Sequence, residues 1–259
     1  MSFRLSLAQQ PLAWHDAEAN RAHFASVLAP LAGATDLVLL PEMFTSGFTM
    51  KPERYAESAD GPTRAWLLEQ ARALDGAVGG SVAVNDDGRF FNRFMLATPD
   101  GDLHQYDKRH LFRMGGEHRH YSAGSRALIV EWRGLRICPL VCYDLRFPVW
   151  SRRRPGLDYD LVVYSANWPA ARRYAWATLL RARAMENQAF VAGVNRVGED
   201  GGGVAHAGDS VILDFTGQPL VDLQDRAQVV TVSLDADALR AWRDKFPAHL
   251  DADAFILES

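Results

Sequence analysis

Cys142 is the side chain in this sequence best suited to act as a nucleophile. It closes an apolar segment, residues 137–142, and the polar residues Tyr143 and Asp144 follow directly. A strand that ended at Cys142 would expose the sulfur at the carboxyl edge of a sheet, where α/β proteins tend to place their sites. A buried cysteine is more often structural, and Cys138, inside the same segment, is interpreted in that way. The thiol of Cys142 therefore needs supporting residues elsewhere in the chain.

Two charged residues could support such a thiol, because a free thiol with a pKa of about 8.5 needs a base and a cation to react near neutral pH. Glu42 follows the apolar run 37–40 and Pro41. The end of a buried strand would leave its carboxylate poorly solvated and suited to accept a proton, although a helix-capping acid is the alternative interpretation. Lys108 lies in the segment 106–112, and taken alone it is interpreted as a solvated surface lysine.

Other catalytic patterns are missing from the sequence. It contains no G-x-S-x-G elbow, no G-x-x-x-x-G-K-[ST] loop and no H-E-x-x-H pair. His110, His118 and His120 stand close together, but no carboxylate or thiolate completes them at the spacing of known zinc sites. We therefore expect neither a metal ion nor another cofactor.

The composition narrows the class of protein. The 259 residues carry 28 Lys and Arg against 32 Asp and Glu, a net charge of −4, so the charge predicts no nucleic-acid partner. Hydrophobic residues make up 48%, enough for a globular core, and the two cysteines share one segment, which excludes a disulfide scaffold. No apolar run approaches the roughly 20 residues that cross a bilayer, and the N-terminus lacks the apolar stretch of a signal peptide. We expect a cytoplasmic protein that binds neither nucleic acid nor membrane.

Short apolar runs alternate with longer amphipathic segments along the chain, a pattern typical of sheets covered by helices. Strands are predicted at residues 3–7, 36–40, 77–84, 91–98, 136–142, 160–165, 189–195, 210–214, 218–222 and 229–234. Helices are predicted at residues 16–32, 62–74, 147–154, 173–187 and 236–245. Hairpins mixed with strand–helix–strand units predict mixed sheets with helices on one face of each. One domain spanning residues 1–259 is the simplest interpretation.

Three segments together resemble the signatures of the nitrilase, or carbon–nitrogen hydrolase, superfamily. They are residues 39–42 (LLPE), 106–112 (YDKRHLF) and 141–148 (VCYDLRFP), in that family's order and at comparable separations. The resemblance continues through residues 165–168, 181–188 and 208–210, so it covers most of the chain. Residues 108–114, 167–170, 193–198 and 245–248 resemble most closely the bacterial omega-amidase branch, which hydrolyses 2-oxoglutaramate.

The resemblance implies a role for each of the charged residues. Cys142 attacks an amide carbonyl, Glu42 takes the thiol proton and later protonates the departing ammonia, and water activated by Glu42 releases the thioester. Lys108 stabilises the oxyanion, with the backbone N–H of Tyr143 as a second donor. In many members of the family a second glutamate orients the lysine and the water. Glu117 is the candidate here, and a loop carboxylate paired with Arg119 or with solvent is the alternative.

Residues near these segments are candidates for substrate binding. Arg146 could bind a substrate carboxylate bidentately, or it could be buried as an ion-pair partner within the scaffold. Trp168, His110 and Phe112 are candidate pocket walls, with ordinary core packing as the alternative.

The resemblance also implies the fold and the reaction. We expect a four-layer α-β-β-α sandwich, with two mixed sheets packed face to face and helices outside, that forms a homodimer or a larger homo-oligomer. We expect it to hydrolyse the omega-amide of a small dicarboxylic acid monoamide, 2-oxoglutaramate, to the acid and ammonia through a cysteine thioester. The alternatives are another reaction of the superfamily, either N-carbamoyl hydrolysis or nitrile hydrolysis, and a catalytically silent binding module.

Overall fold

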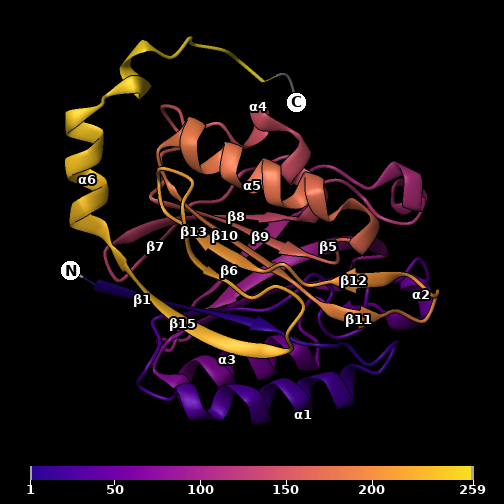
Figure 1. The fold of residues 1–259 in the computed structure, drawn as a ribbon. Helices are drawn as coiled ribbons and strands as arrows, with labels where there is room; N and C mark the ends of the chain where they lie inside the picture. Colours follow the sequence, from indigo (N-terminus) through magenta and orange to yellow (C-terminus); the bar gives the residue numbers. More distant parts are fainter. Residues whose placement is uncertain (1, 258–259) are drawn as a thin grey trace.

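Two mixed β-sheets packed face to face form the centre of the computed structural model, which describes residues 2–257 (Figure 1). Helices cover the outer face of each sheet, so the layers run helix, sheet, sheet, helix. The predicted four-layer α-β-β-α sandwich is confirmed. Of the domain predicted for residues 1–259, residues 1, 258 and 259 lie outside the described part of the chain.

The first sheet has the strand order β15–β1–β2–β4–β5–β6, and β3 pairs with β4. The bounds are Gln228–Asp235 (β15), Ser2–Gln9 (β1), Leu37–Leu39 (β2), Glu57–Ser58 (β3), Ala77–Asp86 (β4), Arg89–Ala97 (β5) and Leu103–Asp107 (β6). Strands β1 to β4 pair in parallel, and the remaining pairs are antiparallel. Because side chains alternate along a strand, Leu37 and Leu39 pack between the sheets while Val38 faces the outer helices.

The second sheet has the order β14–β13–β10–β9–β8–β7. The bounds are Pro219–Asp222 (β14), Val211–Leu213 (β13), Phe190–Asn195 (β10), Leu161–Ala166 (β9), Leu135–Val141 (β8) and Val130–Trp132 (β7). The three central strands β8, β9 and β10 run parallel, so their carboxyl ends meet at one edge. Strands β9 and β10 are buried along their whole length, which explains their continuous apolar sequences.

The helices attach to the sheets through their apolar faces. Helices α1 (Ala17–Leu28) and α3 (Pro62–Leu74) pack on the first sheet, where Phe24 and Leu67 are fully buried. Helix α5 (Arg173–Asn187) covers the second sheet. None of the helices within residues 2–257 combines the length and the apolarity that a membrane span requires.

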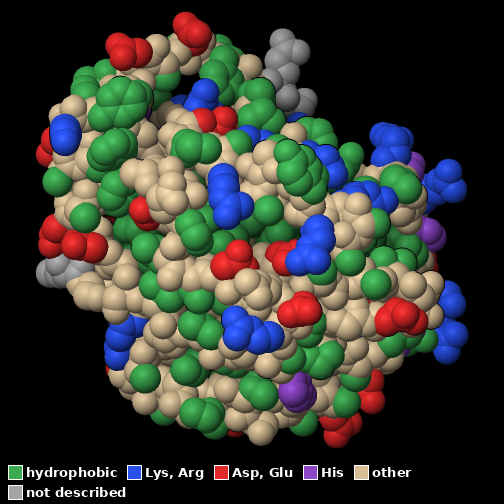
Figure 2. Space-filling view, in the orientation of Figure 1, with side chains coloured by type: hydrophobic (Ala, Val, Ile, Leu, Met, Phe, Trp, Pro, Cys, Tyr) green, Lys and Arg blue, Asp and Glu red, His purple; other side chains and the backbone are tan. Residues whose placement is uncertain are grey.

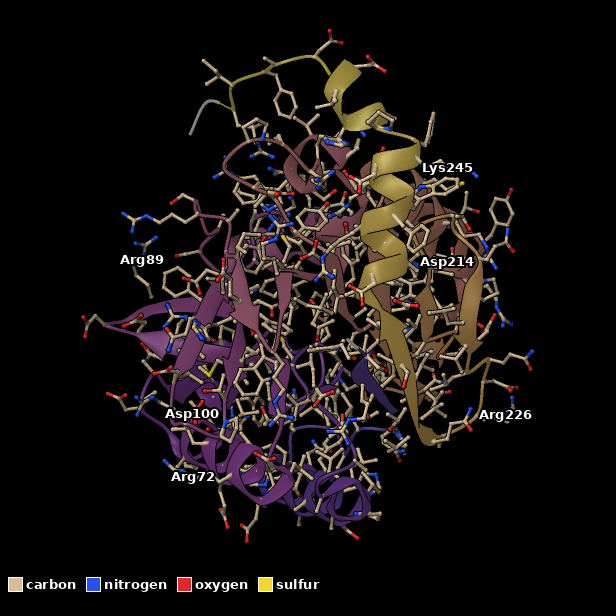
Figure 3. All side chains as sticks on the ribbon, turned by 90° about the vertical axis from the view of Figure 1, so that its left-hand side faces the viewer. Arg72, Arg89, Asp100, Asp214, Arg226 and Lys245 are labelled. Carbon is tan, nitrogen blue, oxygen red and sulfur yellow. The ribbon has the colours of Figure 1, made fainter. Side chains whose placement is uncertain are left out.

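The remaining elements lie at the rim of the sandwich. Helix α2 (Pro52–Tyr55) and the hairpin of β11 (Val197–Glu199) and β12 (Ala205–Ala207) lie together on the right of Figure 1. Helix α6 (Ala236–Lys245) continues from β15 on the opposite side, and the segment after Lys245 arches over the molecule (Figure 3). Single turns of 3-10 helix complete the described chain: η1 (Ala29–Leu31), η2 (Arg113–Gly115), η3 (Glu117–Arg119), η4 (Cys142–Arg146), η5 (Ala170–Arg172) and η6 (Ala248–Asp251).

The helices predicted at residues 62–74, 173–187 and 236–245 have those bounds in the structure. The helix predicted at residues 147–154 is wrong in length, because α4 (Pro148–Ser151) is a single turn. Its end has a structural cause. Arg152 is extended, and Arg153 turns back to form an ion pair with Asp158 at 2.6 Å.

Candidate active site

Cys142 stands at the sharp turn between strand β8 and the 3-10 turn η4. Its φ of 44° lies in the left-handed region, a conformation that costs a non-glycine residue about 1–3 kcal/mol and persists only when the surroundings hold it. The side chain is 9% exposed and lines a cavity. The turn therefore presents the sulfur to the cavity at the carboxyl edge of the second sheet.

Asp144 holds this turn in place. One oxygen of its buried carboxylate accepts the backbone N–H of Val141 at 3.0 Å and the hydroxyl of Tyr106 at 2.8 Å. The other oxygen accepts the backbone N–H of His110 at 3.0 Å and lies 2.8 Å from the ring Nδ1 of His110. Asp144 therefore ties the turn after β8 to the segment that follows β6.

Glu42 follows strand β2 and is fully buried beside Cys142. Its Oε1 accepts hydrogen bonds from Lys108 Nζ and from Asn92 Nδ2, each at 2.8 Å. Its Oε2 accepts the backbone N–H of Asn167 at 2.8 Å, and the Asn167 side chain donates to the Glu42 backbone carbonyl. The negative charge of this carboxylate also raises the pKa of the nearby Cys142 thiol. These contacts fix the carboxylate next to the sulfur.

Lys108 follows strand β6 and lies between two carboxylates. Its Nζ is 2.8 Å from Glu42 Oε1 and 2.9 Å from Glu117 Oε2, and all three side chains are fully buried. The backbone N–H of Phe112 donates to Glu117 Oε2 at 2.5 Å, which holds the loop carboxylate against the lysine. The interpretation of Lys108 as a solvated lysine is wrong, and Glu117 does not pair with Arg119. One ammonium and two carboxylate groups can be buried together away from water only because the ammonium pairs with both carboxylates.

Asn92 in strand β5 joins the two carboxylates and is not among the residues predicted from the sequence. Its Nδ2 donates to Glu42 Oε1 at 2.8 Å and to Glu117 Oε1 at 3.0 Å. Ser81 Oγ donates to Asn92 Oδ1 at 2.8 Å, so the orientation of the amide group is determined. The available signal was an asparagine among the apolar residues of a predicted strand, since a buried position tolerates a polar side chain only with hydrogen-bond partners.

The buried charges change the protonation of the site. Burial raises the pKa of the Cys142 thiol well above its usual value, and the negative charge of Glu42 raises it further, against the effect of Lys108. Burial alone would lower the pKa of Lys108, but the carboxylates of Glu117 and Glu42 outweigh it, so this pKa is raised. Burial also raises the pKa of Glu117, although Lys108 opposes the shift. At neutral pH the sulfur is therefore a thiol and the lysine an ammonium ion.

A cavity of about 420 Å³ opens in front of these groups, a size that suits a small ligand. Its walls include four of the residues predicted to contact substrate, together with apolar side chains from the loops around α2 and η2. They are Tyr143, Arg146, Trp168 and Phe112, with Phe48, Met50 and Met114. The cavity is therefore mostly apolar, with the Cys142 sulfur and a few charged groups at defined places.

Of the residues predicted to contact the substrate, Arg146 lines the cavity and His110 does not. Arg146 lies over the Trp168 ring, with its guanidinium carbon 5.0 Å from the ring centroid. No carboxylate within residues 2–257 pairs with it, so the alternative of a scaffold ion pair is not found. His110 does not line this cavity, because its ring stacks on Phe147 at a centroid distance of 3.8 Å and its Nδ1 is held by Asp144. The structure therefore places His110 behind the turn that carries Cys142.

The cavity wall also contains residues that the sequence analysis did not select. Asn167 directly follows strand β9, and Arg172 ends the turn η5. His206 lies on β12, where it is 6% exposed. Asn167 lies in a segment that resembles the family, but no local pattern marks Arg172 or His206, because the turn and the hairpin reach the cavity only through the fold. Within residues 2–257, no group of three or more His, Cys, Asp or Glu side chains is arranged to hold a metal ion.

Comparison with known proteins identifies relatives along the whole chain. The profile of the carbon–nitrogen hydrolase family matches residues 4–244. Omega-amidase YafV of Yersinia enterocolitica is 51% identical over 259 residues, which cover 99% of each chain. A 2-oxoglutaramate amidase of Bacillus subtilis is 33% identical over 219 residues, 83% of this chain and 84% of the relative.

A solved structure is similar over its full length. It is a CN-hydrolase superfamily protein from Xanthomonas campestris that carries an arsenic adduct in its active site. The two chains share 54% identity, superpose with a TM-score of 0.97, and cover 100% of each other.

Proposed function

The chain belongs to the carbon–nitrogen hydrolase family, as its motif segments predicted, and we propose that it hydrolyses the omega-amide of 2-oxoglutaramate to 2-oxoglutarate and ammonia. The observation that carries the proposal is the burial of Cys142, Glu42 and Lys108 together at one cavity. The similarity to an omega-amidase and to a 2-oxoglutaramate amidase supports the choice of substrate.

The first half of the reaction forms a thioester. Glu42 takes the proton of the Cys142 thiol as the sulfur attacks the amide carbonyl, because the raised pKa of the thiol leaves little thiolate beforehand. The Lys108 ammonium and the backbone N–H of Tyr143 stabilise the oxyanion, and one such donor typically lowers the barrier by about 2.7–4 kcal/mol. The carbon–nitrogen bond then breaks, and Glu42 returns the proton to the departing nitrogen, which leaves as ammonia.

The second half consumes water. Glu42 removes a proton from a water molecule, whose oxygen attacks the thioester carbonyl, and the carbon–sulfur bond breaks. The sulfur leaves as a thiolate and regains its proton from Glu42, while the acyl group leaves as a carboxylic acid. Glu117 and Asn92 hold Lys108 and Glu42 in position through both halves. No step requires a cofactor.

The wall of the cavity provides the selectivity. Arg146 binds the carboxylate at the far end of the substrate, since its guanidinium has no carboxylate partner within residues 2–257. Trp168, Phe112 and Tyr143 surround the short carbon chain. An N-carbamoyl amino acid also carries a carboxylate, so N-carbamoyl hydrolysis is the second candidate function. Nitrile hydrolysis is the third.

A substrate panel tests the proposal, with ammonia release as the readout for 2-oxoglutaramate, neutral alkyl amides, N-carbamoyl amino acids and nitriles. We expect the highest kcat/KM for 2-oxoglutaramate, and a covalent acyl-enzyme at Cys142 by mass spectrometry. Cys142→Ala should reduce turnover to background, whereas Cys138→Ala, which changes a buried thiol within strand β8, should keep it. Rates on 2-oxoglutaramate no higher than on alkyl amides would contradict the substrate, and full activity of Cys142→Ala would contradict the mechanism.

We further propose that the protein is a cytoplasmic homodimer. Hydrophobic side chains gather over α6 and along α5 (Figure 2), and the exposed ones include Tyr174, Met185, Phe246 and Leu250. A second copy of the chain would remove this apolar surface from water. Light scattering should then give a particle of twice the 28.8 kDa chain mass, and a monomer at micromolar concentration would contradict the proposal.

A further inference from the structure

The wall of the cavity carries a second guanidinium group, that of Arg172. We propose that Arg172 and Arg146 together form a clamp for the carboxylate of the substrate, so that Arg172 determines the preference for an acidic amide. This inference rests on the proposed function, because it assigns a residue to the recognition of the substrate proposed above.

The surroundings of Arg172 leave its charge without compensation. Its guanidinium carbon lies 5.4 Å from the centroid of the Phe112 ring, and its Nη2 lies 3.1 Å from the Sδ of Met114. A thioether is a weak acceptor, and no carboxylate within residues 2–257 pairs with this guanidinium. The next residue, Arg173, forms an ion pair with Asp209 at 2.6 Å. Arg172 is therefore held at the cavity by apolar and sulfur contacts, with most of its N–H donors unused.

Trp168 places the two arginines relative to each other. Its indole face lies under Arg146, with 5.0 Å between the guanidinium carbon and the ring centroid. Its indole N–H donates to the backbone oxygen of Arg172 at 2.9 Å. One rigid, buried side chain thus contacts the guanidinium of Arg146 and the backbone of Arg172. Two guanidinium groups at one cavity match the several lone pairs of a carboxylate.

The other charges of the cavity do not cancel these two. The ammonium of Lys108 is paired with the carboxylates of Glu42 and Glu117. Asp200 also lines the cavity, where backbone N–H groups hold its Oδ1 in place, and it forms no ion pair with either arginine. Its negative charge acts instead on the side chains of Arg196 and His206. The end of the cavity with the two arginines is therefore electropositive, and a substrate carboxylate supplies the missing partner.

The experiment measures kcat/KM for 2-oxoglutaramate and for a neutral amide of equal length, pentanamide, and takes the ratio as the discrimination. Arg172→Gln and Arg146→Gln should each lower this ratio by about 10- to 100-fold, mainly through KM for the acidic amide, as expected for a lost charged hydrogen bond. In the double variant the kcat/KM ratio should fall by less than the product of the two single fold-reductions, because both arginines hold the same carboxylate.

Arg113→Gln is the matched control. Arg113 is exposed in the same loop as Met114 but does not line the cavity, so its loss should leave the discrimination within twofold of the wild type. Binding of glutarate to Cys142→Ala, measured by calorimetry, should weaken with Arg172→Gln and not with Arg113→Gln.

Two results would overturn the clamp. An Arg172→Gln enzyme with wild-type discrimination and wild-type glutarate affinity would remove Arg172 from recognition while leaving the proposed function intact. If the fold-reductions of the kcat/KM ratio in the two single variants multiplied in the double variant, the two arginines would contact different parts of the substrate. A wild-type enzyme that does not distinguish 2-oxoglutaramate from pentanamide would instead contradict the proposed function, and the clamp with it.

Discussion

The Cys142 thiol and the Glu42 carboxylate are both buried, and their proximity decides how the thiol is activated. A permanently ionised sulfur is disfavoured, because burial and the nearby negative charge both raise its pKa. The single ammonium of Lys108 is shared between Glu42 and Glu117. The proton therefore moves from sulfur to carboxylate as the substrate is attacked, which keeps the net charge of the site constant.

Replacing the carboxylate should reveal this coupling. In Glu42→Gln the negative charge beside Cys142 is gone, so the pKa of the thiol should fall. The pH at which iodoacetamide alkylates Cys142 should then shift downward, while amide turnover should fall by at least about 100-fold, the typical value of a general base. Peptide mapping locates the modified residue. Cys138 serves as an internal reference, because burial raises its pKa and its side chain is fully enclosed. An alkylation profile that shifts upward would contradict this account of the thiol.

At the scale of elements, the fit of helix α5 on strand β10 depends on Gly193. A Cβ atom there would lie 2.7 Å from side-chain carbons of both Leu180 and Trp176, closer than real contacts allow. These two helix residues are buried, so they cannot move out of the way without a cavity or strain elsewhere. The glycine therefore sets the distance between the helix layer and the second sheet.

Gly193→Ala should destabilise the protein by about 1–3 kcal/mol, the usual cost of overpacking a core. Urea unfolding followed by circular dichroism measures this change. The double variant Gly193→Ala/Leu180→Ala should lose less free energy of unfolding than the two single variants lose together, because the smaller helix residue makes room for the new methyl group. A Gly193→Ala protein as stable as the wild type would show that this glycine does not set the distance between α5 and the sheet.

At the scale of the whole molecule, Asp36 joins the two sheets. Its carboxylate lies 2.9 Å from Arg4 of β1 and 2.5 Å from Arg133, in the turn between β7 and β8. Its backbone oxygen also accepts the indole N–H of Trp132 at 2.7 Å. Burial alone would raise the pKa of Asp36, but the hydrogen bonds from Arg4 and Arg133 outweigh it and lower the pKa to about 2.

This shift makes part of the stability depend on pH. Because the pKa of Asp36 is lower in the folded protein than in the unfolded chain, its contribution is present above about pH 4 and is lost as the pH falls through about 2. The difference corresponds to about 2 kcal/mol. Asp36→Asn should lower the free energy of unfolding by that amount at pH 7, and the two proteins should converge near pH 2. A difference that persists unchanged at pH 2 would contradict the ionic contribution.

One domain for the whole chain stays a prediction, and the contacts of Asp36 give it a test. If both sheets unfold together, circular dichroism and tryptophan fluorescence should report one coincident transition in urea. Two separate transitions would divide the chain into two units.

The sequence by itself determined the strand that leads to Cys142, which ends one residue earlier at Val141, and the acid Glu42 that follows a buried run. It also determined the family to which their motifs belong. These features are local, because a short segment with a given hydrophobic period and a given end allows few structures. It also determined the bounds of the helices at Pro62–Leu74 and Arg173–Asn187, where apolar spacing agrees with the terminal residues.

Only the tertiary structure decided which distant side chains share the cavity. Asn92 joins two carboxylates from the middle of a strand, and Arg172 reaches the cavity from a turn before α5. His110, which belongs to a recognised motif, lies behind the turn after β8 because Asp144 accepts its hydrogen bonds. Burial, charge pairing and the direction of a side chain depend on elements that are far apart in the sequence, and these elements meet only when the two sheets pack together.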